Sequence, residues 1–260
     1  MGILNATPDS FSDGGRYNSV DKALKHAQTM IEQGATMIDV GGESTRPGAS
    51  EVSVEEELSR VIPVVEAIRQ RFDVWISVDT SKAIVMQEAA QVGMDMINDI
   101  RSLTEPNALE TAAKLQLPVC IMHMQGQPKT MQDAPSYDDV FGEVTEFLTK
   151  RIAECVEAGL LRNQIVLDPG FGFGKTLEHN YQLLSNLAKT HRFGLPVLSG
   201  LSRKTMIHKL LDVKPQDATM GSVTGALLSA MQGAQILRVH DVLETKQALD
   251  VWQQTSLRFA

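Results

Sequence analysis

Residues 74–99 read VWISVDTSKAIVMQEAAQVGMDMIND and contain one complete unit of strand, helix and strand. The apolar run at residues 74–78 predicts a buried strand, and the run at residues 94–97 predicts a second one. Between them, residues 82–92 predict a helix. Two strands joined by a helix are typical of a parallel pair, so this unit favours an α/β fold.

The same alternation continues in both directions along the chain. Helices are predicted at residues 20–31, ended by Gly34, and after Ser53, which forms a capping box with Glu56. The remaining helices are predicted at residues 106–114, 137–158, 177–189, 216–232 and 242–254. The apolar runs that predict strands are residues 2–4, 37–40, 74–78, 94–97, 119–122, 165–167, 196–198 and 236–239.

These eight apolar strands favour a parallel sheet that helices cover on its outer face. Closing the sheet into a single (β/α)8 TIM barrel is the economical arrangement, and an open doubly wound sheet is the alternative. The chain has 260 residues, of which 43% are apolar, and contains no linker-like tract. We therefore expect one domain over residues 1–260, with extended loops after the first and second strands.

The composition excludes several classes of function. A net charge of −8 predicts a surface that repels nucleic acid and anionic lipid. No apolar stretch approaches the roughly 20 residues of a membrane span, and the first residues lack the pattern of a signal peptide. Cys120 and Cys155 lie outside any metal-site or disulfide spacing, so we expect reduced thiols in a cytoplasmic protein.

Polar residues follow the apolar runs. In barrels of this kind the chemistry lies at the carboxyl ends of the strands and in the loops beyond them. A single polar residue there is often a helix cap, but eight at one rim predict a functional site. These residues are Asn5, Asp39, Asp79, Asn98, His123, Asp168, Ser199 and His240.

Asp79, Asn98 and Asp168 suit a flat heterocycle that is rich in hydrogen-bond donors. A carboxylate accepts two hydrogen bonds from an amino group and a ring N–H, and an amide both donates and accepts. The alternative is that these three residues are helix caps or members of an ion-pair network.

Four positive groups are placed to bind an anion: Arg46, Lys204, Arg238 and His240. Residues 238 and 240 alternate with Val239, so both side chains point to the same side of the last strand. Loops after the seventh and eighth strands of such barrels often bind phosphate. The alternative is that these are ordinary solvated surface charges.

Three glycine-rich loops follow strands. The loop at residues 168–176, DPGFGFGKT, has Pro169 where a nucleoside-triphosphate loop needs glycine, so the sequence does not favour nucleotide binding. Its glycines still permit close backbone approach to a ligand. The loops at residues 7–15 and 41–48 are longer than a minimal turn, which predicts functional lids, with tolerated insertions as the alternative.

Taken in order, several of these stretches resemble the bacterial, sulfonamide-sensitive dihydropteroate synthases. The resemblance spans nearly the whole chain. It implies the condensation of 6-hydroxymethyl-7,8-dihydropterin diphosphate with p-aminobenzoate, by an SN1-like route, in folate biosynthesis. The matching stretches are residues 1–15, 39–48, 78–82, 98–100, 168–175, 202–204 and 238–241.

The resemblance also implies roles for single residues. Lys204 would lie against the pterin ring, and Asn5 would ligate Mg²⁺ on the diphosphate. Asp39 would lie nearby and, with Lys204, Arg238 and His240, complete the catalytic set. The pterin would be held by Asp79, Asn98 and Asp168, and the diphosphate by Asn5, Arg238 and His240.

The p-aminobenzoate would lie near Ser202, with sulfonamides as competing ligands. Residues of the two long loops would close over it, namely Ser10, Phe11, Thr45, Arg46 and Pro47. Members of this family typically pair through their last helices, so the resemblance also implies a homodimer.

Two departures from the family pattern are expected to affect stability rather than chemistry. Position 6 is Ala where the family usually has Val. The sequence also starts at the first strand, without the short segment that usually caps the bottom of the barrel.

Two rival functions are less well supported. A methyltetrahydrofolate-binding methyltransferase needs neither the 202–204 loop nor the pair Arg238 and His240. A non-catalytic pterin-binding subunit predicts the loss of Asn5, Lys204 or Arg238, and all three are present.

Overall fold

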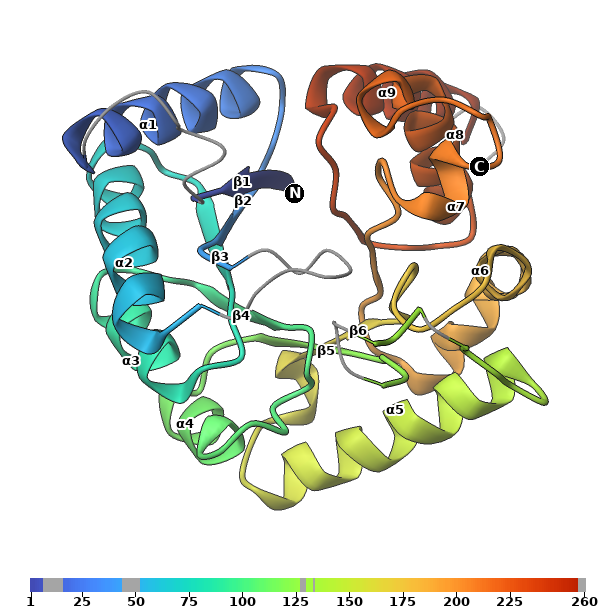
Figure 1. The fold of residues 1–260 in the computed structure, drawn as a ribbon, viewed down its shortest axis with the longest axis horizontal. Coiled ribbons are helices and arrows are strands. Elements are labelled where there is room, and N and C mark those ends of the chain that lie inside the picture. The colour runs from blue at the N-terminus through green and yellow to red at the C-terminus, as the bar shows by residue number, and fades with distance from the viewer. Residues whose placement is uncertain (7–15, 44–51, 127–129, 133, 257–260) are drawn as a thin grey trace.

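The computed structural model describes residues 1–6, 16–43, 52–126, 130–132 and 134–256 (Figure 1). Within these residues the strands are β1 (Gly2–Asn5), β2 (Met37–Gly41), β3 (Trp75–Asp79), β4 (Met96–Asp99), β5 (Val119–Met122), β6 (Ile165–Asp168), β7 (Leu198–Ser199) and β8 (Ile236–Leu237). The helices are α1 (Arg16–Glu32), α2 (Val54–Arg71), α3 (Ala83–Gln91), α4 (Ala108–Leu115), α5 (Val140–Glu157), α6 (Leu177–Ser185), α7 (Thr205–His208), α8 (Thr219–Met231) and α9 (Val242–Ser256). The 3-10 turns are η2 (Arg162–Gln164), η3 (Leu187–Phe193) and η4 (Pro215–Asp217).

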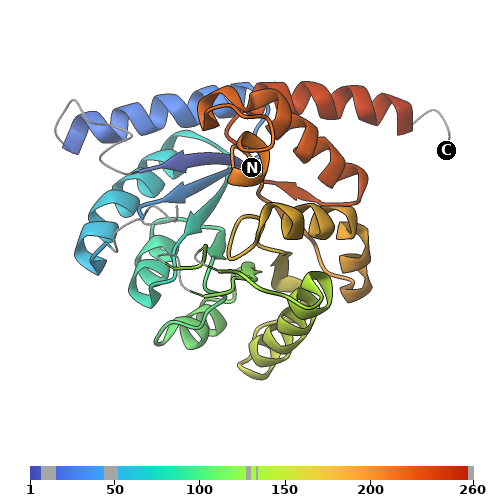
Figure 2. The same ribbon diagram turned by 45° about the vertical axis from the view of Figure 1, so that its right-hand side comes forward.

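The strands form a closed parallel barrel. β1 to β6 pair in chain order, and β7 pairs with β8. A parallel bridge between Leu167 and Val197 joins the sixth strand to the seventh, and a bridge between Gly2 and Val239 joins the eighth to the first. Figures 1 and 2 show the helices as an outer ring around the strands. The expected (β/α)8 barrel is confirmed, and the open doubly wound sheet is wrong.

The interior of the barrel changes character along its axis. Alternate residues of each strand face inward. At the amino ends of the strands these are apolar and form a small buried cluster. At the carboxyl ends they are polar, so the sheet places charged groups at one rim. The apolar cluster consists of Met96, Cys120, Val166 and Leu198, with Met1, Met37 and Ile236 packed against it.

Local signals set the ends of several helices. Gly34, with φ of +101°, follows the last turn of α1 as expected. The Ser53 hydroxyl accepts a hydrogen bond from the Glu56 amide at 3.1 Å and caps α2. The Glu56 carboxylate pairs with Arg60, so the predicted capping box is formed only on the serine side.

The helix predicted at residues 177–189 is shorter than expected. It divides into α6 and η3, because the Asn186 side chain donates to the Gln182 carbonyl at 2.8 Å and ends the α-helical turn. Within the described residues, no helix is long and apolar enough to cross a bilayer.

Candidate active site

A cavity of about 440 Å³ opens at the carboxyl end of the barrel. It is bordered by the end of β1 and by the loops after β7 and β8. Six residues expected at the site line it: Asn5, Asp79, Ser202, Lys204, Arg238 and His240. Asp39, Asn98 and Asp168 are buried beside these residues, at 5% exposure or less.

Arg238 is the centre of a buried charge network. Its Nε donates to Asp39 Oδ2 at 2.6 Å, and its Nη2 donates to Asp79 Oδ2 at 3.0 Å. The Asn98 side-chain nitrogen lies 3.3 Å from both carboxylate oxygens of Asp39. Residues of β2, β3 and β4 and the residue that follows β8 are therefore held in one contiguous arrangement.

Burial and charge oppose each other at this network. Burial, helped by the neighbouring carboxylates, raises the pKa of Asp79 to about 7 even though the Arg238 guanidinium favours its ionised form. Burial by itself lowers the pKa of Arg238, but Asp39 and Asp79 more than reverse this effect. The guanidinium therefore stays charged, while Asp79 exchanges a proton near neutral pH.

Asp168 at the end of β6 and Lys204 in the loop after β7 interact electrostatically. The Lys204 side chain donates to the Phe171 carbonyl at 2.6 Å and lies over the Phe173 ring, 4.5 Å from its centre. Burial lowers the pKa of Lys204 to about 8, an effect that Asp168 partly offsets. Burial also raises the pKa of Asp168, and Lys204 opposes that rise.

Glycine in the loop after β6 permits this approach. Gly172 has φ of +80°, and a Cβ there would lie 3.0 Å from Lys204 Cδ. The loop was expected to approach a ligand closely. In the structure its glycine makes room for a lysine of the site.

The loops after β7 and β8 are fastened to each other. Ser202 Oγ lies 3.0 Å from His240 Nδ1, and the same oxygen accepts the His240 amide at 3.2 Å. Arg203 Nε donates to Asp241 Oδ2 at 3.0 Å. These paired contacts explain how Ser202, Lys204 and His240 come to line one cavity.

Two of the eight strand-end residues do not face the cavity, and this part of the prediction is wrong. Ser199 is hydrogen-bonded to Ser229 of α8 at 2.9 Å, because its parity in β7 turns it outward. His123 lies beside Lys175 under the glycine loop. Asp39 does face the site, but it lies within β2 rather than beyond its end.

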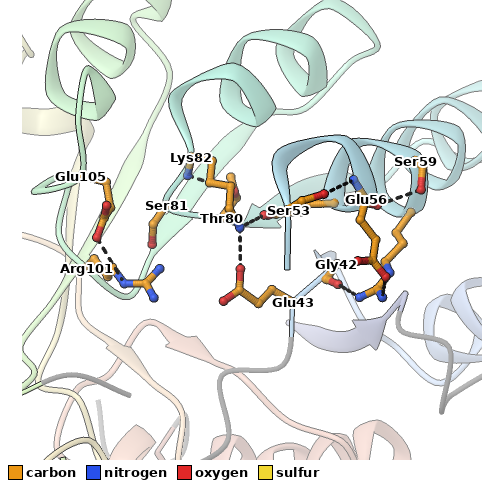
Figure 3. Close-up of polar contacts among 12 residues, drawn as sticks. Gly42, Glu43, Ser53, Glu56, Ser59, Thr80, Ser81, Lys82, Arg101 and Glu105 are labelled. Carbon is orange, nitrogen blue, oxygen red and sulfur yellow. Dashed lines mark hydrogen bonds and ion pairs between the residues drawn. The ribbon is translucent and has the colours of Figure 1, made fainter. Parts of the chain in front are cut away.

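The residues expected to close over p-aminobenzoate, Ser10, Phe11, Thr45, Arg46 and Pro47, lie outside the described residues. Glu43 is the last described residue of the loop that follows β2, and it lines the cavity. Its Oε2 is 2.5 Å from Lys82 Nζ (Figure 3). Lys82 also pairs with the buried Glu57. Sequence reasoning missed this ion-pair cluster, although the motif at residues 78–82 ends on its lysine.

Comparisons with known proteins agree with this geometry. A family model described as pterin binding enzyme matches residues 1–240. The dihydropteroate synthase of Escherichia coli (strain K12) is 64% identical over 98% of this chain and 90% of its own length. The Yersinia pestis dihydropteroate synthase in a sulfonamide drug complex superposes with a TM-score of 0.94 at 62% identity, over 98% of this chain and 93% of that one.

A Xanthomonas albilineans dihydropteroate synthase in complex with 7,8-dihydropteroate superposes with a TM-score of 0.89 at 45% identity, over 98% of this chain and 92% of that one. The fold, the cavity at the carboxyl rim and the relatives all lead to the same family. The chain belongs to the dihydropteroate synthases, a family of pterin-binding transferases.

Proposed function

We propose that this chain condenses 6-hydroxymethyl-7,8-dihydropterin diphosphate with p-aminobenzoate to give 7,8-dihydropteroate and diphosphate in folate biosynthesis. The observation that carries this proposal is one cavity that combines buried carboxylates with the basic side chains of Lys204, Arg238 and His240. The carboxylates suit the donor-rich edge of a pterin. The basic groups suit a diphosphate. The Xanthomonas albilineans relative, solved with 7,8-dihydropteroate, supports the choice of product.

The pterin is assigned to the side of the cavity formed by β3, β4 and β6. Asp79 and Asp168 accept from its amino group and ring N–H, and Asn98 both donates and accepts. Lys204, already stacked over Phe173, lies against the ring. Asp39 acts by orienting Arg238 and Asn98, with which it shares hydrogen bonds.

The reaction is proposed to begin with cleavage of the C–O bond. The bonding electron pair leaves with the diphosphate, and Arg238 and His240 stabilise its developing charge. The pterin methylene cation that remains is stabilised by Asp79 and Asp168. The neutral arylamine nitrogen then forms the C–N bond and loses one proton to solvent water. It needs no dedicated general base to act as a nucleophile.

The residues of the site fit Mg²⁺ as a companion of the diphosphate. No group of three or more His, Cys, Asp or Glu side chains within the described part of the chain could hold a metal alone. Mg²⁺ commonly binds one or two protein oxygens together with substrate phosphates and waters. Asn5, which lines the cavity, would supply such an oxygen. Bound there, the ion would neutralise charge on the diphosphate.

The direct test mixes the protein with the pterin diphosphate, p-aminobenzoate and Mg²⁺, and follows both products. We expect dihydropteroate and diphosphate to form in equal amounts, and neither to form after chelation with EDTA. Binding of the pterin diphosphate without turnover would instead support a non-catalytic pterin-binding subunit.

The same assay tests which residues bind p-aminobenzoate. Ser202 is proposed to lie near the p-aminobenzoate carboxylate, with Ser10, Phe11, Thr45, Arg46 and Pro47 closing over the ring. A sulfonamide drug complex of the Yersinia pestis relative is known. We therefore expect sulfamethoxazole to inhibit turnover and excess p-aminobenzoate to restore it. Normal turnover at high sulfamethoxazole, without excess p-aminobenzoate, would contradict this assignment.

A homodimer that pairs through the last helices is also proposed, in the cytoplasm, where Cys120 and Cys155 would remain the free thiols that the structure has. Its support is an apolar surface on α8 and α9. There Met220 is 77% exposed and Val251 is 69% exposed. The other exposed apolar residues of these helices are Leu228, Met231 and Leu243.

Placing a charge on this surface tests the pairing. We expect Met220→Glu to shift the protein from dimer to monomer in analytical ultracentrifugation, because a carboxylate would be buried without a partner. Trp75→Glu is the matched control, since Trp75 is also exposed but lies at the start of β3. A monomeric unmodified protein, or a dimeric Met220→Glu variant, would exclude this interface.

A further inference from the structure

Lys175 is a buried lysine to which the proposed mechanism gives no role. Its side chain is 3% exposed and its ammonium lies inside the glycine loop after β6. The nitrogen donates to the carbonyl oxygens of Gly170 at 2.8 Å and Phe173 at 3.0 Å. It also lies 3.0 Å from His123 Nδ1 and 3.4 Å from the His123 carbonyl oxygen. One ammonium therefore contacts acceptors on two residues of the loop and on His123, which follows β5.

The outer side of the same loop contacts Lys204. The Phe171 carbonyl accepts from the Lys204 ammonium at 2.6 Å, and the Phe173 ring lies beneath it. Gly170, which Lys175 holds by its carbonyl, donates its amide to Asp168 at 2.7 Å. The loop thus stands between the two lysines and connects both to the carboxylate.

The loop tolerates little displacement. A Cβ at Gly170 would overlap the His123 carbonyl, and one at Gly174 would overlap the backbone of Gln125. The side-chain oxygen of Asn180 accepts the Gly172 amide at 2.7 Å. With these neighbours on its flanks, the loop has one well-defined arrangement, and the Lys175 ammonium is its interior support.

We propose that Lys175 is a positioning residue for the pterin side of the reaction: its buried ammonium fixes the glycine loop, and the loop fixes Lys204 beside Asp168. This inference rests on the proposed roles of Lys204 and Asp168 toward the pterin. Losing the ammonium would remove the lysine donor from the Phe173 and His123 carbonyl oxygens and leave the Gly170 carbonyl with the Phe173 amide, 3.1 Å away. Such unsatisfied buried groups drive a rearrangement.

The contact with His123 has a second consequence. While Lys175 is protonated, its ammonium can only donate, so Nδ1 of His123 accepts and the proton of the neutral ring lies on Nε2. Burial and then the charge of Lys175 lower the pKa of His123 to about 3. The histidine therefore remains a neutral acceptor, and its titration reports whether the Lys175 charge is present.

The test measures dissociation of 6-hydroxymethyl-7,8-dihydropterin diphosphate and the KM for p-aminobenzoate in the unmodified protein and in Lys175→Met. We expect the pterin dissociation constant to rise by about tenfold or more, corresponding to lost hydrogen bonds of a charged group, with the KM for p-aminobenzoate nearly unchanged. Lys175→Arg, which keeps the charge, should recover part of the affinity. Lys150→Met is the control, because Lys150 is 78% exposed on α5.

Two further readouts separate positioning from general damage. In Lys175→Met the pKa of His123, followed by NMR, should rise because the neighbouring charge is gone. Amide exchange should accelerate at residues 170–174 but not at the distant residues 93–95. If Lys175→Met fails to fold, Lys175→Gln, which retains two donors, provides the same comparison.

The outcomes are distinguishable from failure of the proposed function. If the unmodified protein does not bind the pterin diphosphate, the proposed function fails. If the unmodified protein binds it and the folded Lys175→Met or Lys175→Gln variant binds it equally well, the positioning role is wrong. Equal weakening for the pterin and for p-aminobenzoate would also overturn it, because the loop contacts Asp168 and Lys204, which are assigned to the pterin.

Discussion

Arg238→Ala should lower kcat/KM by about 10³-fold, the range seen when a donor to developing negative charge is removed. Arg238 is proposed to meet the departing diphosphate, and it also holds Asp39 and Asp79 in place. The substitution therefore removes the charge that stabilises the leaving group and leaves two carboxylates facing the same space. Steady-state turnover and calorimetric binding of inorganic diphosphate would measure the two effects.

The same variant should lose stability in a pH-dependent way. Removing one partner of a buried ion pair costs about 3–5 kcal/mol of unfolding free energy. Asp79 already has a pKa of about 7, above its ordinary 3.8, and loss of the guanidinium raises it further. An acid whose pKa is higher in the folded state destabilises the fold as pH rises above its unfolded value. The Asp79 part of the stability difference from the unmodified protein should therefore be nearly absent below pH 7 and grow as pH rises above 7.

Arg69→Ala is the matched control. Arg69 is also a structural arginine, but it donates to the carbonyls of Gly93 and Val74 at the amino ends of the strands. Its loss should lower stability and leave turnover unchanged below the unfolding temperature. An Arg238→Ala variant with unaltered turnover would refute the role of Arg238. The double variant Arg238→Ala with Asp79→Asn should be more stable than Arg238→Ala alone, because it no longer carries the unpaired Asp79 carboxylate. It should remain as inactive as Arg238→Ala.

The barrel could be predicted from the sequence because each strand is a short apolar run separated from the next by an amphipathic helix. Such runs give the number and order of strands, while their ends are set by hydrogen bonding that hydrophobicity does not report. β7 and β8 illustrate this limit, since only Leu198–Ser199 and Ile236–Leu237 pair as strands. Isolated bridges at Val197 and Val239 complete the ring.

The candidate site was predictable where chemistry and strand parity agree. Arg238 and His240 line the cavity, as the alternation predicted for residues 238–240 requires. Ser199 also follows an apolar run, but it faces α8. The reason is that Leu198 faces the barrel interior, so the next residue in the strand points outward. Lys175 could not be recognised from its position in a glycine loop, since its role depends on carbonyl groups that converge only after folding.

Asp79 should give the site its dependence on pH. The proposed role of Asp79 requires the carboxylate, which accepts hydrogen bonds from the pterin, and burial places its pKa at about 7. Below that pH the free protein must lose a proton before binding, so affinity should fall by about tenfold per pH unit. Lys204, with a pKa lowered to about 8, and Lys175, with a pKa lowered to about 7, lose charge as pH rises and act in the opposite direction.

Asp79→Asn separates these effects, because asparagine keeps the size of the side chain and carries no charge. We expect it to weaken binding of 6-hydroxymethyl-7,8-dihydropterin by about 100-fold at high pH, as for a lost charge-assisted hydrogen bond. The fall in affinity below pH 7 should disappear, while the fall above pH 8 that Lys204 causes should remain. A ligand without the diphosphate is used so that its phosphate ionisation does not enter the profile. If the affinity of Asp79→Asn still falls below pH 7, another group causes that fall. Asp168, whose pKa burial also raises, would be the next candidate.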